Sequence, residues 1–379
     1  MRLLLNAAAL LALSSCAIMY PDPDPEEKQE TFASNPEEYS YRAKKYFLQG
    51  EYGRARVQLS KYLEHEPSSW MSQVHLHYCD YYLGLRRLKS GNIKGGRKLI
   101  SNAEGGLRRL WGGDLAQSTS ETAGTARQPW KAAFGIAICQ RGLGWADNLQ
   151  AERQSRALKT LKRDDPRRQD LQRDIIEVRE RSSGNYTSSA ILLERLVEMK
   201  ESSPEAIKNL AELRLIQAKD DEAEKHFLHY LRLADATYQK RSKALEEGGE
   251  VDQTFKSKQN RQFAKDLLLE KLDANSTKRV DVLVNLGHLN YQKGSYLKAI
   301  SFLERAKTIQ PDRLDILLKM GQCLGENKQY EAAIKHLRDY IERSTGKDTS
   351  FNEDIAQAFR LKASYERKLK TSGASGRRP

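Results

Sequence analysis

Apolar and small side chains recur three or four residues apart along most of residues 39–369, with charged side chains between them. This spacing places apolar side chains on one face of an α-helix. Prolines, which interrupt helices, are rare in the same region, and five of the ten lie between Tyr39 and Arg378. The pattern therefore predicts an almost entirely helical chain, and the expected fold class is all-α.

A longer repeat, close to 34 residues, is superimposed on the helical spacing. Its clearest copy is residues 280–313, where two apolar helical stretches are separated by Gly294 and followed by Pro311. Small residues recur where two antiparallel helices would cross closely, and leucines fill the space around those crossings. The positions that carry the pattern are Leu283, Leu286, Gly287, Tyr291, Gly294, Tyr296, Ala299, Leu303, Ala306 and Pro311.

Five other segments follow the same spacing, and together the six copies resemble tetratricopeptide repeats. The other copies run from Tyr39 to Pro67, Leu83 to Ala103, Ile176 to Leu193, Leu210 to Tyr230 and Leu314 to Tyr340. The resemblance implies a tetratricopeptide-repeat helical solenoid, a superhelix of antiparallel helix pairs in which each repeat touches its neighbours. It also implies a concave groove that binds an extended or helical peptide segment.

The resemblance also indicates which residues line this groove, because the family uses fixed positions of the first helix of each repeat. In this sequence the groove candidates are Lys44 and Phe47 in the first copy, and Asp281, Val284, His288, Tyr291, Gln292, Asp315, Leu318, Gln322 and Glu326 in the last two. Side chains at these positions could equally be ordinary solvent-facing residues. Chaperone-binding members hold a terminal carboxylate with a lysine–asparagine clamp, but Val284 and His288 stand at the corresponding positions, so no clamp is expected.

Two stretches interrupt the repeats and set the expected domain boundaries. Residues 105–130 have the glycine- and tryptophan-rich composition of an irregular insertion, and residues 238–279 that of a charged helical linker. The expected organisation is a signal peptide at 1–15, a lipidated stalk at 16–38, a first repeat block at 39–237, the linker at 238–279, a second block with a capping helix at 280–369, and a disordered basic tail at 370–379.

The first sixteen residues resemble a bacterial lipoprotein signal. An apolar stretch over residues 3–13 is too short to span a bilayer and has the proportions of a signal-peptide core. Residues 13–16 (Leu-Ser-Ser-Cys) resemble a lipobox, which implies cleavage before Cys16 and its acylation, an anchor of two or three chains. The alternative is an ordinary secretory signal with an incidental cysteine. Ala17, where an Asp would favour the inner membrane, favours the outer membrane, facing the periplasm.

Patterns that would indicate catalysis or metal binding are few. The cysteines after Cys16 are Cys79, Cys139 and Cys323. Their spacing does not fit a metal site. Cys139 and Cys323 lie in apolar helical contexts and are expected to be buried small side chains, although an oxidising compartment would allow a Cys79–Cys139 disulfide. The paired histidines are His75 and His77, and His226 and His229. Neither pair has a third ligand nearby, and no common catalytic motif is present, so no enzymatic activity, cofactor or metal site is expected.

The net charge of +13 is unevenly distributed along the chain. The acidic, proline-rich stalk at residues 21–38 carries −6, which favours an extended spacer, whereas residues 86–111 carry +7 and residues 360–379 carry +6. The basic-patch candidates are Arg86, Arg87, Arg97, Lys98, Arg108 and Arg109. An anionic envelope polymer, a lipid surface or an acidic partner would suit these clusters, and a plain solvated face is the alternative. Nucleic acid is not expected, because an exported protein rarely meets it.

The sequence thus predicts a membrane-anchored, non-enzymatic protein–protein interaction scaffold of the bacterial cell envelope. Its partner would be a peptide segment of an envelope protein, bound in the concave groove, and the N-terminal lipid would hold the protein at the membrane. Type IV pilus pilotins and lipoproteins of outer-membrane protein assembly share this combination of anchor and repeats, which favours a role in assembling an envelope machine. The alternative function is binding of an anionic envelope polymer or lipid surface through the basic clusters.

Overall fold

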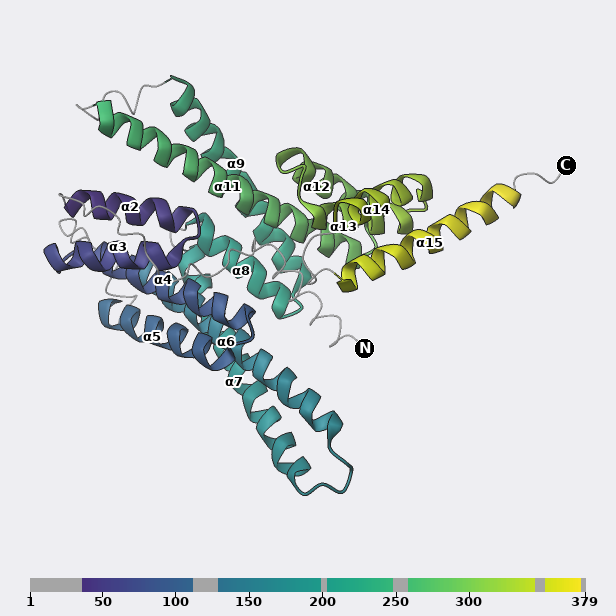
Figure 1. Ribbon diagram of the computed structural model, residues 1–379, viewed down its shortest axis with the longest axis horizontal. Coiled ribbons are helices and arrows are strands. Elements are labelled where there is room, and N and C mark those ends of the chain that lie inside the picture. Colours follow the sequence, from purple (N-terminus) through teal and green to yellow (C-terminus); the bar gives the residue numbers. More distant parts are fainter. Residues whose placement is uncertain (1–35, 112–128, 199–202, 248–257, 345–351, 376–379) are drawn as a thin grey trace. The chain divides into compact units, whose positions relative to one another are not determined.

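The structure, a computed structural model, describes residues 36–111, 129–198, 203–247, 258–344 and 352–375, and all regular structure within these ranges is helical (Figure 1). In chain order the helices are α2 (Pro36–Leu48), α3 (Tyr52–His65), α4 (Trp70–Lys89), α5 (Ile93–Trp111), α6 (Pro129–Thr160), α7 (Arg167–Glu198), α8 (Pro204–Ile216), α9 (Asp220–Glu247), α11 (Lys258–Gln292), α12 (Tyr296–Ile309), α13 (Leu314–Glu326), α14 (Tyr330–Ser344) and α15 (Asn352–Ser375). The predicted all-α fold is confirmed for this part of the chain.

The helices belong to two compact units, each built from consecutive helix pairs. The first holds α2 to α8 with residues 258–271 of α11, and the second holds α9, the rest of α11 and α12 to α15. In the first unit α2 packs on α3, α4 on α5 and α6 on α7, and in the second α13 packs on α14. Alternate helices also touch, α4 with α6, α6 with α8 and α13 with α15, as expected when helix pairs stack side by side.

Small residues at the helix crossings make these pairs possible. A Cβ atom added to Gly287 of α11 would lie 2.8 Å from Cγ of Leu303 on α12, and one added to Gly321 of α13 would lie 2.7 Å from Cγ of Leu337 on α14. The two contacts are 34 residues apart in the sequence, so the repeat in the sequence is a repeat in the packing. Ala299 and Ala333 are fully buried at the same crossings.

Five of the turns between consecutive helices have the same geometry, whether or not they contain glycine. Gly50, Gly91 and Gly294 have φ of 80°, 83° and 73°, a conformation that glycine adopts at little cost. Ala218, after α8, and Lys328, after α13, have the same backbone conformation, with φ of 58° and 63°. In all five turns the following N–H donates to the carbonyl five residues earlier, as in the motif that commonly ends helices.

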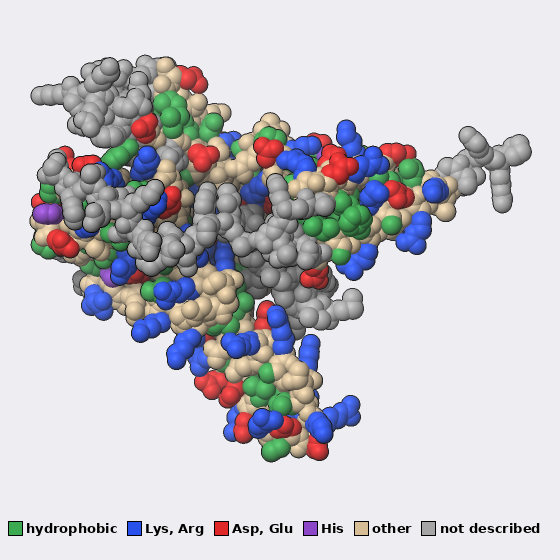
Figure 2. All heavy atoms as spheres, viewed as in Figure 1, with side chains coloured by type: hydrophobic (Ala, Val, Ile, Leu, Met, Phe, Trp, Pro, Cys, Tyr) green, Lys and Arg blue, Asp and Glu red, His purple; other side chains and the backbone are tan. Residues whose placement is uncertain are grey.

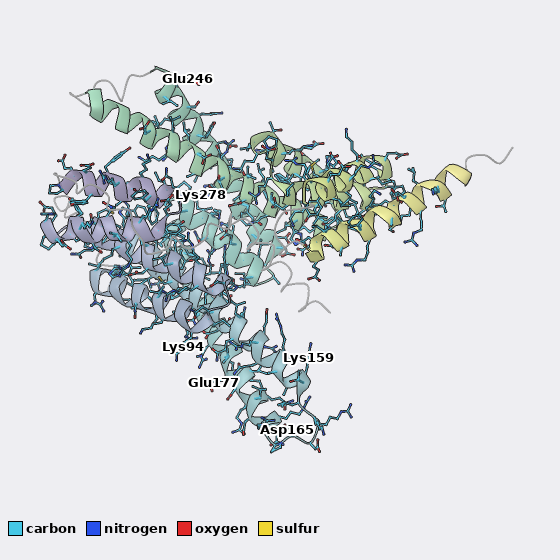
Figure 3. The ribbon with its side chains drawn as sticks, in the orientation of Figure 1. Lys94, Lys159, Asp165, Glu177, Glu246 and Lys278 are labelled. Carbon is cyan, nitrogen blue, oxygen red and sulfur yellow. The ribbon has the colours of Figure 1, made fainter. Side chains whose placement is uncertain are left out.

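Helix α6 is the centre of the first unit. Residues 132–140 are all buried, because α6 is covered by α4, α5, α7 and α8. Helices α6 and α7 have 32 residues each, and their distal halves form a hairpin in which Lys159 and Asp165 lie near the turn (Figure 3). The turn is stabilised by Arg168, which donates to the carbonyls of Leu158 and Leu161 at 3.1 and 3.2 Å.

The helix ends differ from several boundaries expected from the sequence. The tail expected to be disordered from residue 370 instead continues α15 to Ser375, and Thr371 Oγ1 donates to the carbonyl of Lys368 at 2.8 Å. Within the expected insertion at 105–130, residues 105–111 belong to α5, and within the expected linker at 238–279 both ends are helical. The lipobox with Cys16, the stalk up to residue 35, and residues 112–128 and 376–379 lie outside the described residues.

Candidate peptide-binding surfaces

The groove candidates on α11 and α13 fall into three groups in the structure. The first group is neutralised by ion pairing. Arg313, just before α13, donates from Nη1 to Oδ1 of Asp281 at 2.7 Å and from Nε to Oδ1 of Asp315 at 2.9 Å. These two carboxylates therefore connect successive helix pairs, and neither is a free charge for a ligand.

The second group is buried. Val284 is 5% exposed and Leu318 is 8% exposed, because neighbouring helices of the second unit cover both side chains. The resemblance placed them in the groove, but the structure places them in the packed interior. Cys323 is also buried on α13, and burial raises the pKa of its thiol to about 12.

The third group remains accessible to differing degrees. Gln292 and Glu326 are exposed, whereas His288, Tyr291 and Gln322 are half-buried. Burial, helped by the nearby Lys319 ammonium, lowers the pKa of His288 to about 4. Burial, with the Glu326 carboxylate as the next cause, raises the pKa of Tyr291 to about 12.

Helix α15 closes one end of this surface. A Cβ atom on Gly325 would lie 2.0 Å from Cζ of Tyr365, so the tyrosine ring rests directly on the glycine backbone. The Tyr365 hydroxyl lies 3.3 Å from Oε1 of Glu326, and the ring stacks on Tyr330 with centroids 5.9 Å apart. The Tyr365 side chain of α15 thus covers the backbone of α13 at Gly325.

In the first unit the two groove candidates lie beside an aromatic cluster from α2, α3 and α4. The Phe47 ring lies 5.3 Å from Tyr52, 6.0 Å from His75 and 5.7 Å from Tyr82, measured between centroids. Tyr52 and Tyr82 stack at 4.4 Å. Lys44, one turn before Phe47, is exposed.

Sequence reasoning missed three residues that the structure brings to this cluster: His75, Tyr78 and Lys131. Burial lowers the pKa of His75 to about 4, and the ammonium groups of Lys131 and Lys44 lower it further. The Tyr78 hydroxyl donates to the carbonyl of Lys131 at 2.5 Å. His75 and Lys131 lie near the starts of α4 and α6, ahead of the positions that the repeat pattern covers, so the spacing contained no signal for them.

The basic-patch candidates differ in whether they contact other groups of the protein. Arg86 donates to the carbonyl of Gly50 at 3.2 Å, Arg97 pairs with Asp147, and Arg108 pairs with Glu104 at 2.7 Å. Arg87, Lys98 and Arg109 are exposed. Residues 97 and 108 are separated by about 16 Å along α5, since a helix rises 1.5 Å per residue. In Figure 2 several Lys and Arg side chains lie along α5, separated from one another by uncharged atoms.

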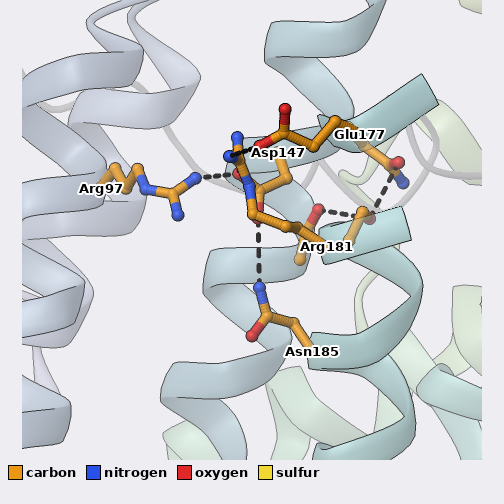
Figure 4. A network of polar contacts seen from close by, with 8 residues as sticks. Arg97, Asp147, Glu177, Arg181 and Asn185 are labelled. Atoms are coloured by element: carbon orange, nitrogen blue, oxygen red, sulfur yellow. Dashed lines mark hydrogen bonds and ion pairs between the residues drawn. The ribbon is translucent and has the colours of Figure 1, made fainter. Parts of the chain in front are cut away.

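Two buried ion-pair networks connect the helices of the first unit. Asp147 of α6 is completely buried and interacts with Arg97 of α5, with Asn185 of α7 at 3.1 Å and with Arg181 at 3.8 Å (Figure 4). On α8, burial would raise the pKa of Glu212, but Lys208 and Arg141 outweigh this effect and lower it to about 2.

The cysteines and the other possible metal ligands form neither a disulfide nor a metal site in the described part of the chain. Cys79, Cys139 and Cys323 are buried free thiols, and Cys79 and Cys139 belong to different apolar clusters, so the Cys79–Cys139 disulfide is not formed. Within the described ranges no three His, Cys, Asp or Glu side chains are arranged to hold a metal ion. None of the described helices is both long and apolar enough for a bilayer.

Comparison with known proteins identifies the repeat at the sequence level. Residues 280–313, which contain the Gly287–Leu303 crossing, match the tetratricopeptide repeat family. The predicted fold class, a tetratricopeptide-repeat helical solenoid, is confirmed. No curated protein matches the chain.

Several solved structures are similar at low sequence identity. PilF from Pseudomonas aeruginosa is 13% identical, with 78% of this chain and 90% of that chain covered and a TM-score of 0.34. The TPR2AB domain of yeast Sti1, in complex with pHSP90, is 10% identical, with 86% and 98% covered and a TM-score of 0.28. A tetratricopeptide repeat protein from Parabacteroides merdae is 13% identical, with the same coverage and a TM-score of 0.30.

Proposed function

We propose that this tetratricopeptide-repeat protein is a non-enzymatic scaffold that binds peptide segments of other proteins on the first helices of its repeats. The observation that carries the proposal is the surface of α11 and α13, where the Glu326 carboxylate lies near the half-buried Tyr291, and where Gln292 is exposed and Gln322 half-buried on the same two helices. An aromatic ring among amide and carboxylate groups can accept both the backbone and the apolar side chains of a peptide.

We further propose that the scaffold is anchored in the bacterial cell envelope by lipid on Cys16, in the outer membrane and facing the periplasm. The support is the lipobox-like sequence at residues 13–16, the preceding apolar stretch and Ala17. The acidic stalk would hold the folded units away from an anionic membrane surface, because like charges repel. Through such a tether the scaffold would present partner segments during assembly of an envelope machine.

The alternative, binding of an anionic polymer or lipid through the basic patch, has less support. Three of its six candidates, Arg86, Arg97 and Arg108, make intramolecular contacts that stabilise helix packing or a helix turn. An enzymatic role also lacks support, because burial or ion pairing accounts for the strongly shifted pKa values, those of His288, Cys323 and Glu212 included. We therefore retain the scaffold as the proposed function.

Crosslinking in cells, followed by purification of the full chain, tests the proposal. The expected result is one or a few reproducible envelope proteins joined to the wild-type chain. The Cys16→Ser variant should lose membrane fractionation and yield fewer of the same adducts, while folding normally. A chain that fractionates with the membrane but captures no reproducible protein would overturn the scaffold function, and membrane fractionation that is independent of Cys16 would overturn the lipid anchor.

A further inference from the structure

We propose that a surface of α2, α4 and α6 binds an acidic peptide segment that also carries apolar side chains. This inference rests on the proposed scaffold function and names the chemistry of one class of partner. The surface, called the lysine–aromatic surface below, consists of Lys44, Phe47, His75, Tyr78, Trp130 and Lys131.

The residues of this surface converge from three helices that are distant in the sequence. The centroids of Phe47 on α2 and His75 on α4 are 6.0 Å apart, and those of His75 and Tyr78 are 6.2 Å apart. Tyr78 then reaches α6, where its hydroxyl donates to the carbonyl of Lys131 at 2.5 Å. The three helices are therefore held together at this point by ring contacts and a hydrogen bond.

The two lysines of the surface are not neutralised within the described part of the chain. Lys44 has no carboxylate partner there, and Lys131 Nζ lies 3.6 Å from Sδ of Met71 and 5.6 Å from the centroid of Trp130. Neighbouring basic residues differ, since Arg42 pairs with Glu38 and Arg56 pairs with Asp80. Two positive charges thus remain available for an anionic ligand.

The setting of Lys131 strengthens its attraction for an anion. Burial lowers the pKa of its ammonium group, which shows that water solvates this charge incompletely. A carboxylate placed beside it would interact in a medium of lower effective dielectric than bulk water. Lys131 also lies in the first turn of α6, where the helix dipole adds positive potential.

Two further titratable residues, His75 and Glu205, lie near the lysines and Tyr78. His75 is neutral at physiological pH because burial, Lys131 and Lys44 lower its pKa to about 4, so it offers a hydrogen bond rather than a third charge. Burial raises the pKa of the Tyr78 phenol, and the Glu205 carboxylate of α8 lies close enough to raise it further.

These features specify the ligand. The two lysines select Asp or Glu side chains, and the Phe47, Tyr78 and Trp130 rings select apolar side chains beside them. A peptide of neutral or basic composition would leave both ammonium groups without a partner. The ligand is thus an acidic segment of another protein in which Glu or Asp alternates with aromatic or aliphatic residues.

The test uses the full-length protein and three pools of fluorescein-labelled synthetic peptides with the same apolar positions. The polar positions are Glu in the first pool, Gln in the second and Lys in the third. Fluorescence anisotropy should show at least tenfold tighter binding to the Glu pool, with affinity falling as salt increases. The Lys44→Glu/Lys131→Glu variant should lose this preference, and so should Lys44→Gln/Lys131→Gln, which avoids placing new charges beside Met71.

A matched control changes charge elsewhere in the same unit. Arg87→Glu/Lys98→Glu alters two exposed residues and should leave binding within twofold of the wild type. Equal binding of the Glu and Gln pools, or unchanged binding by a folded Lys44→Gln/Lys131→Gln variant, would overturn this inference and leave the scaffold function intact. Failure to bind any pool, together with no crosslinked partner in cells, would overturn both this inference and the scaffold function.

The chain's own acidic residues 21–35 are the competing occupant, since they lead directly into α2. Replacing their Asp and Glu residues by Asn and Gln should leave the affinity for the Glu pool unchanged within twofold. An increase of tenfold or more would mean that this segment occupies the surface, and would overturn the assignment to another protein.

Discussion

Arg97 of α5 and Asp147 of α6 form an ion pair in which the carboxylate is completely buried while the guanidinium remains partly exposed. Asn185 and Arg181 of α7 reach the same carboxylate, at 3.1 and 3.8 Å. One aspartate therefore connects three helices of the first unit. Arg97 belonged to the expected anion-binding patch, but its contacts indicate a role in holding α5 against α6.

Removing Arg97 should destabilise the first unit. The Arg97→Ala variant leaves the Asp147 carboxylate buried with weaker compensation, and breaking a buried pair from one side costs about 3 kcal/mol or more. Urea unfolding followed by circular dichroism measures the loss. Arg173→Ala is the matched control, because Arg173 and its partner Asp170 are both highly exposed, and it should not shift the midpoint. Equal midpoints for the two variants would contradict the assigned role.

Glycine should stabilise the two turns that lack it. Ala218 and Lys328 have positive φ, which costs a residue with a side chain about 1 kcal/mol relative to glycine. Ala218→Gly and Lys328→Gly should therefore each raise the free energy of unfolding by about 0.5–1 kcal/mol. Lys335→Gly, in the middle of α14, should instead lower it by about 1 kcal/mol. A loss of stability at all three positions would show that these turns are not strained.

Some of the fold could be predicted from the sequence because it depends on local spacing. Gly287 and Leu303, and the equivalent pair 34 residues later, indicate helix crossings without any three-dimensional information. The glycine turns at Gly50, Gly91 and Gly294 are visible for the same reason. The turn at Ala218 is not, since alanine has no preference for positive φ and is fixed there by the packing on either side.

The candidate sites were harder to predict because they depend on contacts between distant segments. Val284 and Leu318 occupy groove positions of the family, yet neighbouring helices bury them. The lysine–aromatic surface requires α2, α4 and α6 to meet, and residues 44, 75 and 131 share no repeat position. Charge counts along residues 86–111 could not show that half of the basic candidates already have partners.

Packing of α15 should depend on the absence of a side chain at Gly325. A methyl group there would overlap the Tyr365 ring, so Gly325→Ala should displace α15 and lower the free energy of unfolding by about 1–3 kcal/mol. Hydrogen–deuterium exchange should show faster exchange in residues 352–371. Adding Tyr365→Leu, which removes the clashing ring, should recover part of the loss. No change in exchange for Gly325→Ala would contradict the contact.

The stability of the second unit should depend on pH through His288. Its pKa is about 4 in the folded protein, against 6.5 for a histidine in water, so the unfolded chain takes up a proton first as the pH falls. The stability that the neutral His288 contributes is fully present above pH 6.5 and is lost as the pH falls to about 4. At about 1.4 kcal/mol per pKa unit, the loss is up to about 3 kcal/mol.

The His288→Gln variant should therefore show a shallower decrease in stability between pH 6.5 and pH 4, measured by urea unfolding at each pH. His65→Gln, at an exposed histidine in the first unit, is the matched control. An unchanged slope for His288→Gln would mean that this histidine is protonated in the folded protein at the same pH as in the unfolded chain.

Partner proteins should bind on the first helices of the repeats. Site-specific photocrosslinking in cells tests it most directly, with the photoreactive residue placed at Gln322 of α13 or at Leu297 of α12, which is 67% exposed. A discrete adduct with an envelope protein from position 322, and none from position 297, is the predicted result. The same adducts from both positions, or an adduct from position 297 alone, would show that partners do not bind specifically on the first helices.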